Sequence, residues 1–88
     1  MEVEFLRRFY KDLDKIKTRK DKGSILLAID LVKSAESIDQ IPSISKLSGY
    51  QDAYRIRCGN YRIGVLLDSG TITFARVAHR KEIYKLFP

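Results

Sequence analysis

The sequence predicts an α+β domain in which a small antiparallel sheet carries a pair of helices on one face. Residues 53–67 alternate between polar and apolar side chains around Gly59-Asn60, a dipeptide suited to a two-residue hairpin turn. Two earlier stretches, 9–16 and 24–38, instead place apolar residues at helical spacing. Helices with one apolar face need a surface to cover, so we expect the order strand, two helices, three strands and a short C-terminal helix.

Chain length and composition limit the class of protein. The 88 residues suit one domain, spanning 1–88, and a hydrophobic content of 44% argues against disorder. No apolar run approaches the ~20 residues of a membrane span, and Glu2 and Glu4 interrupt any signal-peptide pattern. We therefore expect a cytoplasmic protein with no membrane partner. The single cysteine, Cys58, excludes an internal disulfide and a thiolate zinc site, and its place in a strand predicts a small core residue.

The positive charge is concentrated in the second part of the chain. The net charge is +6, yet residues 1–52 hold ten basic against nine acidic side chains, whereas residues 53–88 hold seven against two. In the predicted strands these basic residues are all arginine, whose planar guanidinium suits bidentate contacts with phosphate or carboxylate. A polyanionic partner follows, either nucleic acid or an acidic protein segment.

The N-terminal half supplies the predicted first strand and both helices. Residues 2–5 alternate as a short strand does, and Phe9, Leu13 and Ile16 predict a helix of about ten residues. The basic run 15–22 is interpreted as a solvated helix end and turn. Ser24, after Gly23, is expected to cap the second helix. The serine-rich stretch that follows Pro42 is predicted to be a loop.

The register of the first hairpin follows from its turn. If Cys58 lies opposite Tyr61, then Arg57 lies opposite Arg62 and Arg55 opposite Gly64. One face of the hairpin becomes apolar and the other collects arginine. Like charges directly opposite each other in a sheet cost up to ~1 kcal/mol, so this arrangement favours folding only if an anion binds there.

A second hairpin is predicted at Asp68-Ser69-Gly70, with Gly70 in the left-handed position of a three-residue loop. That loop places Phe74 opposite Gly64 and Arg76 opposite Arg62. A two-residue Ser69-Gly70 turn would instead bury Arg76, and the cost of burying a charge favours the longer loop.

The predicted site is this arginine face. Gly64 is expected to leave space on it, and Phe74 to offer a surface for stacking a base, which together suit single-stranded nucleic acid. The alternative is a solvated sheet face whose arginines pair with Asp68 and Glu82. The five arginines are Arg55, Arg57, Arg62, Arg76 and Arg80.

Phosphodiester cleavage is a more specific hypothesis for this face than nucleic-acid binding alone. The sequence has no paired carboxylates and no metal-ligand cluster, so we expect neither a metal nor any other cofactor. Arginines aimed at the charge on phosphorus remain, with Tyr84 or His79 as proton-transfer groups. His79 can equally point to the other sheet face. Phe74 and Tyr84 equally suit a structural role, covering the exposed sheet.

Three segments of the sequence resemble the RelE/ParE superfamily of bacterial type II toxins. They are Tyr54–Arg57, Gly59–Ile63 and Val77–Tyr84. The helical pattern before Pro42 and the Leu47-Ser48-Gly49 approach to the hairpin fit as well, so the likeness covers nearly the whole chain. It implies a RelE-like fold and a toxin whose activity a cognate antitoxin protein neutralises.

For the RelE branch the resemblance implies an mRNA interferase, a metal-independent endoribonuclease that cuts the message in the ribosomal A site. The nucleophile would be the message's own ribose 2′-hydroxyl. By position, Arg62 would stabilise the phosphate transition state, Arg80 would assist the leaving group or hold charge, and Tyr84 would orient or deprotonate the nucleophile. Arg55 and Arg57 would bind phosphate and ribosomal RNA, and the further predicted RNA contacts are Arg76, Phe74 and His79.

Two other functions are kept beside this one. ParE-like members of the superfamily act on DNA gyrase, and a degenerate member would only bind its antitoxin or operator DNA. The segment 79–84 favours the nuclease, whereas Gly64-Val65 departs from the bulkier residues usual in that strand. In each case we expect an acidic or apolar antitoxin segment to lie over the helices or the arginine face.

Overall fold

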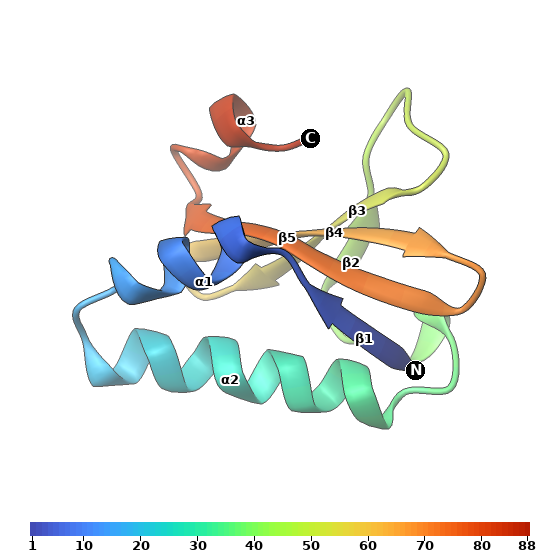
Figure 1. Ribbon diagram of the computed structural model, residues 1–88, viewed down its shortest axis with the longest axis horizontal. Coiled ribbons are helices and arrows are strands. Elements are labelled where there is room, and N and C mark those ends of the chain that lie inside the picture. The colour runs from blue at the N-terminus through green and yellow to red at the C-terminus, as the bar shows by residue number, and fades with distance from the viewer.

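The computed structural model describes all 88 residues as one five-stranded sheet with helices on both faces (Figure 1). The strand order is β1-β5-β4-β3-β2. The predicted α+β class is confirmed. The elements are β1 (Glu2–Phe5), α1 (Arg7–Asp14), α2 (Arg19–Ser34), a 3-10 helix (Ile38–Gln40), β2 (Ile44–Lys46), β3 (Ala53–Cys58), β4 (Tyr61–Asp68), β5 (Thr71–His79) and α3 (Ile83–Leu86).

The sheet is mixed, not purely antiparallel as predicted. β1 pairs in parallel with β5, since the chain returns to that edge only after both helices and the other strands. A strand also lies where a loop was predicted, because β2 pairs antiparallel with β3 and places Ile44 opposite Ile56. β2 has three residues, too few for an alternating pattern to be visible in the sequence.

Helix α2 begins at Arg19, so the prediction that Ser24 caps it was wrong. The cap is Thr18, whose hydroxyl accepts the backbone N–H of Asp21 at 3.2 Å and donates to the Asp21 carboxylate at 2.6 Å. The Thr18 hydroxyl thereby satisfies one of the free N–H groups of the first turn. Gly23 therefore lies inside the helix, and the Ser24 hydroxyl donates to the carbonyl of Lys20 at 3.2 Å.

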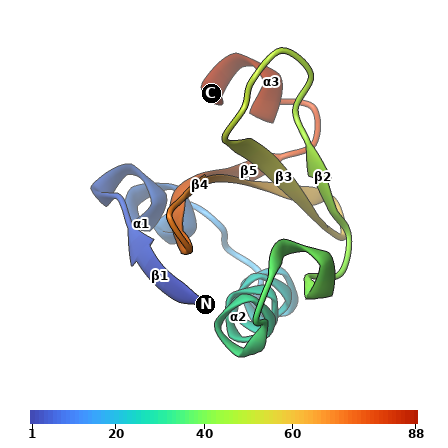
Figure 2. The same cartoon turned by 90° about the vertical axis from the view of Figure 1, so that its right-hand side faces the viewer.

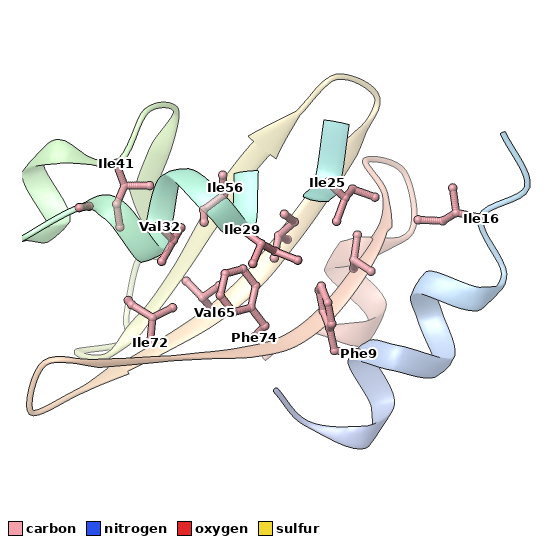
Figure 3. Packing of buried hydrophobic residues seen from close by; sticks show 13 residues of the cluster. Phe9, Ile16, Ile25, Ile29, Val32, Ile41, Ile56, Val65, Ile72 and Phe74 are labelled. Carbon is pink, nitrogen blue, oxygen red and sulfur yellow. The ribbon is translucent and has the colours of Figure 1, made fainter. Parts of the chain in front are cut away.

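The main core lies between α2 and the sheet (Figure 3). The predicted stripe of α2 supplies Ile25, Ile29 and Val32, which pack against strand residues such as Ile56 and Val65. Cys58 is half-buried at the edge of this core, and burial raises the pKa of its thiol. None of the helices combines the length and the apolar character needed to cross a membrane.

The helices lie on different sides of the sheet. Two views at right angles place α2 below the sheet and α3 above it (Figure 2). A second, smaller cluster holds α3 in place through Ile83 and Phe87, which pack on Ala53 and Ala75. The face opposite α2 is therefore only partly open.

The first hairpin has the predicted register, whereas the second does not. Asp68 pairs with Thr71, so the turn is the two-residue Ser69-Gly70, with φ angles of 50° and 83°. Phe74 consequently lies opposite Val65, in the core, and the predicted three-residue loop was wrong. The extra residue is accommodated within the strands: a bulge between Gly64 and Val65 leaves Ala75 unpaired.

The bulge places Arg76 opposite Gly64, from where its side chain reaches helix α1. Its Nε donates to Asp12 Oδ2 at 2.7 Å and its Nη2 to Oδ1 at 3.0 Å, while the Val77 N–H donates to Oδ2 at 3.1 Å. The two side chains are 14% and 7% exposed. The hydrogen bond with Asp12 raises the pKa of Arg76. Arg76 thus joins α1 to β5, and Asp12 engages its guanidinium.

Replacing Asp12 with alanine should lower the free energy of unfolding by about 3–5 kcal/mol, because it leaves a largely buried guanidinium without a partner. Urea denaturation measures this loss. Asp14→Ala, at the exposed end of the same helix, is the matched control and should stay within about 0.5 kcal/mol of the wild type. Equal losses in the two variants would contradict the anchoring role of Asp12.

Candidate functional site

Four arginines gather on the sheet face opposite α2, and we call them the arginine cluster: Arg55, Arg57, Arg62 and Arg80. The electrostatics of Arg62 report how close they lie. Its pKa is lowered first by desolvation and then by the positive charges of Arg57, Arg80 and Arg55. Arg57 lies directly opposite Arg62 in the β3–β4 ladder, and Arg55 lies two residues from Arg57 on the same face.

Arg62 is held in place by the hairpin that carries it. Its Nη1 donates to the carbonyls of Gly59 and Tyr61, both at 2.9 Å. Nε and Nη2 have no hydrogen-bond partner in the protein, so their N–H groups remain free for a ligand. The backbone N–H of Arg80 donates to the Asn60 carbonyl at 2.8 Å, which fixes Arg80 beside the same turn.

No carboxylate compensates the arginine cluster. The structure contains a single salt bridge, Arg76 with Asp12, and both of its members lie outside the cluster. The alternative in which Asp68 and Glu82 neutralise the arginine face is thereby wrong. A guanidinium does not lose its proton near neutral pH, so the repulsion within the cluster is relieved only when an anion binds.

An open polar hollow of about 400 Å³ runs between β2, β3, β4 and α3, and we call it the arginine groove. Tyr84 of α3 forms one wall, 72% exposed, with its ring centroid 4.9 Å from the Arg55 guanidinium carbon. Such a contact is a cation–π interaction. The groove is lined by Ser43, Ile44, Ser45, Arg55, Arg57, Arg62 and Tyr84. A phosphate flanked by planar bases fits this chemistry.

Phe74 and His79 are not part of the site. Phe74 is fully buried, its ring centroid 5.0 Å from that of Phe5 and 5.5 Å from that of Phe9. The His79 ring lies 5.9 Å from that of Tyr61, on the α2 side of the sheet, and its Nδ1 accepts the Lys81 N–H at 3.2 Å. Both positions follow from the two-residue turn and the alternation of β5. The predicted placement of Phe74 on the arginine face was wrong, and His79 lies on the other face, the alternative that the sequence left open. The Arg76 guanidinium is bonded to Asp12 and does not line the arginine groove.

Two features of the site were not predicted from the sequence. Ser43 and Ser45 line the groove only because the short strand β2 lies beside β3. Asp12, which withdraws Arg76 from the cluster, did carry a signal: it falls between Phe9 and Ile16 at helical spacing, so it lies on the buried face of α1. An acid at such a position needs a buried basic partner.

Comparison with known proteins agrees with this architecture. Residues 3–84 match the family described as ParE toxin of type II toxin-antitoxin system, parDE. The chain is 43% identical to Toxin RelE3 of Methanocaldococcus jannaschii, and the alignment covers 100% of both proteins.

Solved structures agree as well. The RelB-RelE antitoxin-toxin complex from Methanococcus jannaschii contains a chain with a TM-score of 0.82 and 41% identity, covering 98% of this chain and 100% of that one. The archaeal RelE-RelB complex from Pyrococcus horikoshii OT3 has the same fold, with a TM-score of 0.72 and 20% identity over 90% of this chain and 93% of that one. Identity along the full length, the family match and the shared fold together establish that this chain belongs to the RelE/ParE superfamily of type II toxins.

Proposed function

We propose that this toxin is a ribosome-dependent endoribonuclease that cleaves mRNA without a metal ion and is neutralised by a cognate antitoxin protein. The observation that carries the proposal is the uncompensated arginine cluster with Tyr84 at its edge. Identity of 43% to a RelE toxin supports the nuclease branch of the superfamily. The toxin would encounter the ribosome and its message in the cytoplasm.

In the proposed reaction the message's own 2′-hydroxyl attacks the adjacent phosphorus. The O2′–P bond forms as the P–O5′ bond breaks, which yields a 2′,3′-cyclic phosphate and a 5′-hydroxyl end. One proton leaves O2′ and one is delivered to O5′. Negative charge builds on the non-bridging oxygens in between, and fixed cationic donors stabilise that charge best.

The side chains of the arginine groove, together with Arg80 of the arginine cluster, suit four roles in this reaction. Arg62, fixed by two backbone carbonyls and with Nε and Nη2 free, would hold the non-bridging oxygens. Tyr84 would orient or deprotonate the 2′-hydroxyl, and Arg80 would stabilise the leaving oxygen. Arg55 and Arg57 would bind neighbouring phosphates of the message or of ribosomal RNA.

Arg62→Ala and Arg80→Ala should each reduce codon-associated cleavage by about 100-fold, the loss expected when one charge-stabilising donor is removed. Primer extension on messages from cells expressing each variant measures the cuts. Arg8→Ala, an exposed arginine of α1 outside the groove, should cut like the wild type. A message with a 2′-deoxynucleotide immediately 5′ of the cut phosphate should resist cleavage.

Undiminished cleavage in both arginine variants would overturn the assigned roles, and cleavage of the 2′-deoxy message would overturn the nucleophile. The match to a ParE toxin family keeps one competing function in view. Intact messages together with blocked DNA supercoiling by gyrase would select that function. Normal growth on expression, with an antitoxin complex still forming, would select an inactive binding module.

For the antitoxin we propose a docking site beside the arginine groove, since the related RelE chain from Methanococcus jannaschii was solved with RelB. An apolar hollow of about 230 Å³ lies between α2 and the segment 41–43, and Leu27 and Leu31 on its rim are 60% and 42% exposed. Arg57 and Ser43 line both this hollow and the arginine groove. An amphipathic acidic segment would fill the hollow, pair with Arg57 and obstruct the groove.

Leu27→Glu should weaken the antitoxin complex at least tenfold, because it places a charge in the apolar hollow. Leu26→Glu is the matched control: Leu26 is 52% exposed on the same helix, lies outside the hollow and should leave affinity unchanged. Calorimetric titration with the antitoxin at low and high salt measures the apolar contribution of the hollow and the electrostatic contribution of Arg57. Equal losses in the two variants would exclude the hollow, and salt-independent affinity would exclude the pairing with Arg57.

A further inference from the structure

Helix α3 has no stability of its own. It spans Ile83–Leu86, a single turn, and a helix of that length does not persist in water without tertiary contacts. Two buried side chains attach it to the sheet, Ile83 at 1% exposure and Phe87 at 7%. The Phe87 N–H closes the turn by donating to the Ile83 carbonyl at 2.9 Å. The position of α3 therefore depends on what Ile83 and Phe87 contact.

The Phe87 ring occupies the place where any residue but glycine would carry its side chain at position 64. A Cβ atom built on Gly64 would lie 2.5 Å from Phe87 Cδ2 and 2.8 Å from Cδ1, distances so short that the ring or the strand would have to move. Gly64 lies directly opposite Arg55 in the β3–β4 ladder. The space that the sequence predicted beside Gly64 is thus filled by the protein itself, next to the arginine that Tyr84 covers.

Tyr84 lies in the chain between Ile83 and Phe87, the two buried side chains that attach α3 to the sheet. Its ring is 72% exposed and contacts the Arg55 guanidinium, an interaction worth only about 0.5–1 kcal/mol at an exposed site. That contact alone does not hold a one-turn helix on the sheet. We infer that Phe87 is a positioning residue, whose ring seated over Gly64 fixes Tyr84 at the edge of the arginine groove. The effect of Phe87 on catalysis rests on the proposed function, whereas its effect on the position of Tyr84 does not.

The geometric part is tested by nuclear magnetic resonance on the isolated toxin. The Arg55 side-chain protons lie under the Tyr84 ring and should be shifted upfield by its ring current. The shift should disappear in Tyr84→Ala, which assigns it, and also in Phe87→Ala and Gly64→Ala. Gly23→Ala is the matched glycine control, since a Cβ there meets nothing within 4 Å, and it should retain the shift. Persistence of the shift in Phe87→Ala and Gly64→Ala would overturn the inference.

The double variant Gly64→Ala/Phe87→Ala separates positioning from general damage. Removing the ring removes the steric clash, so the double variant should match Phe87→Ala in both the Arg55 shift and the thermal midpoint. Additive losses would mean that Gly64→Ala perturbs β4 independently of Phe87, and would count against the inference. The double variant also serves if Gly64→Ala alone fails to fold.

The catalytic part uses single-turnover cleavage on programmed ribosomes. Phe87→Ala should slow cleavage about 100-fold, as misplacing a catalytic group does, with ribosome affinity within about twofold of the wild type. In a Tyr84→Phe background, Phe87→Ala should not slow cleavage further, because Phe87 affects cleavage only through the position of Tyr84. A further loss of similar size would overturn the inference. If the wild type cuts nothing, the proposed function fails, while the resonance experiment still decides the geometry.

Discussion

The structure depends on a register that forces like charges together. In the β3–β4 ladder Arg57 lies directly opposite Arg62, and desolvation, followed by repulsion from Arg57 and the other arginines of the cluster, lowers the pKa of Arg62. A cross-strand pair of this kind costs up to ~1 kcal/mol, which is a sizeable part of the stability of a small domain. The same register places Ile56 opposite Ile63 in the core. The charges therefore cannot move apart by a shift of one residue without exposing that core.

Arg76 of β5 has a different role from the arginine cluster. The bulge beside Gly64 brings Arg76 to Asp12, whose carboxylate accepts two hydrogen bonds from it, while no carboxylate pairs with the arginine cluster. One arginine thus joins a helix to the sheet, and the four arginines of the cluster have no carboxylate partner. The bulge also shifts the register of β4 against β5 next to Gly64, the residue on which the Phe87 ring sits. A single irregularity therefore separates the arginine that has a carboxylate partner from the four that have none.

Sequence reasoning succeeded where a local pattern determines the structure. The Gly59-Asn60 turn determines the register of the first hairpin and thereby the placement of Arg55, Arg57 and Arg62. It failed where a choice depends on distant residues. Without knowledge of Asp12 the cost of burying Arg76 argued against the two-residue turn, yet the bulge and that carboxylate remove the cost. β2 exists only because β3 offers it an edge, and no local pattern marks it.

The central claim is that the arginine cluster binds a chain of phosphates. Its most direct test is the salt dependence of binding to a short single-stranded RNA. Each phosphate contact contributes about −0.7 to the slope of log K against log salt concentration, so four arginines predict a slope near −3. Replacing Arg55, Arg57, Arg62 or Arg80 singly with alanine should reduce the slope by about 0.7, and Arg8→Ala should leave it unchanged. A slope near zero, or equal slopes in all five variants, would contradict the account.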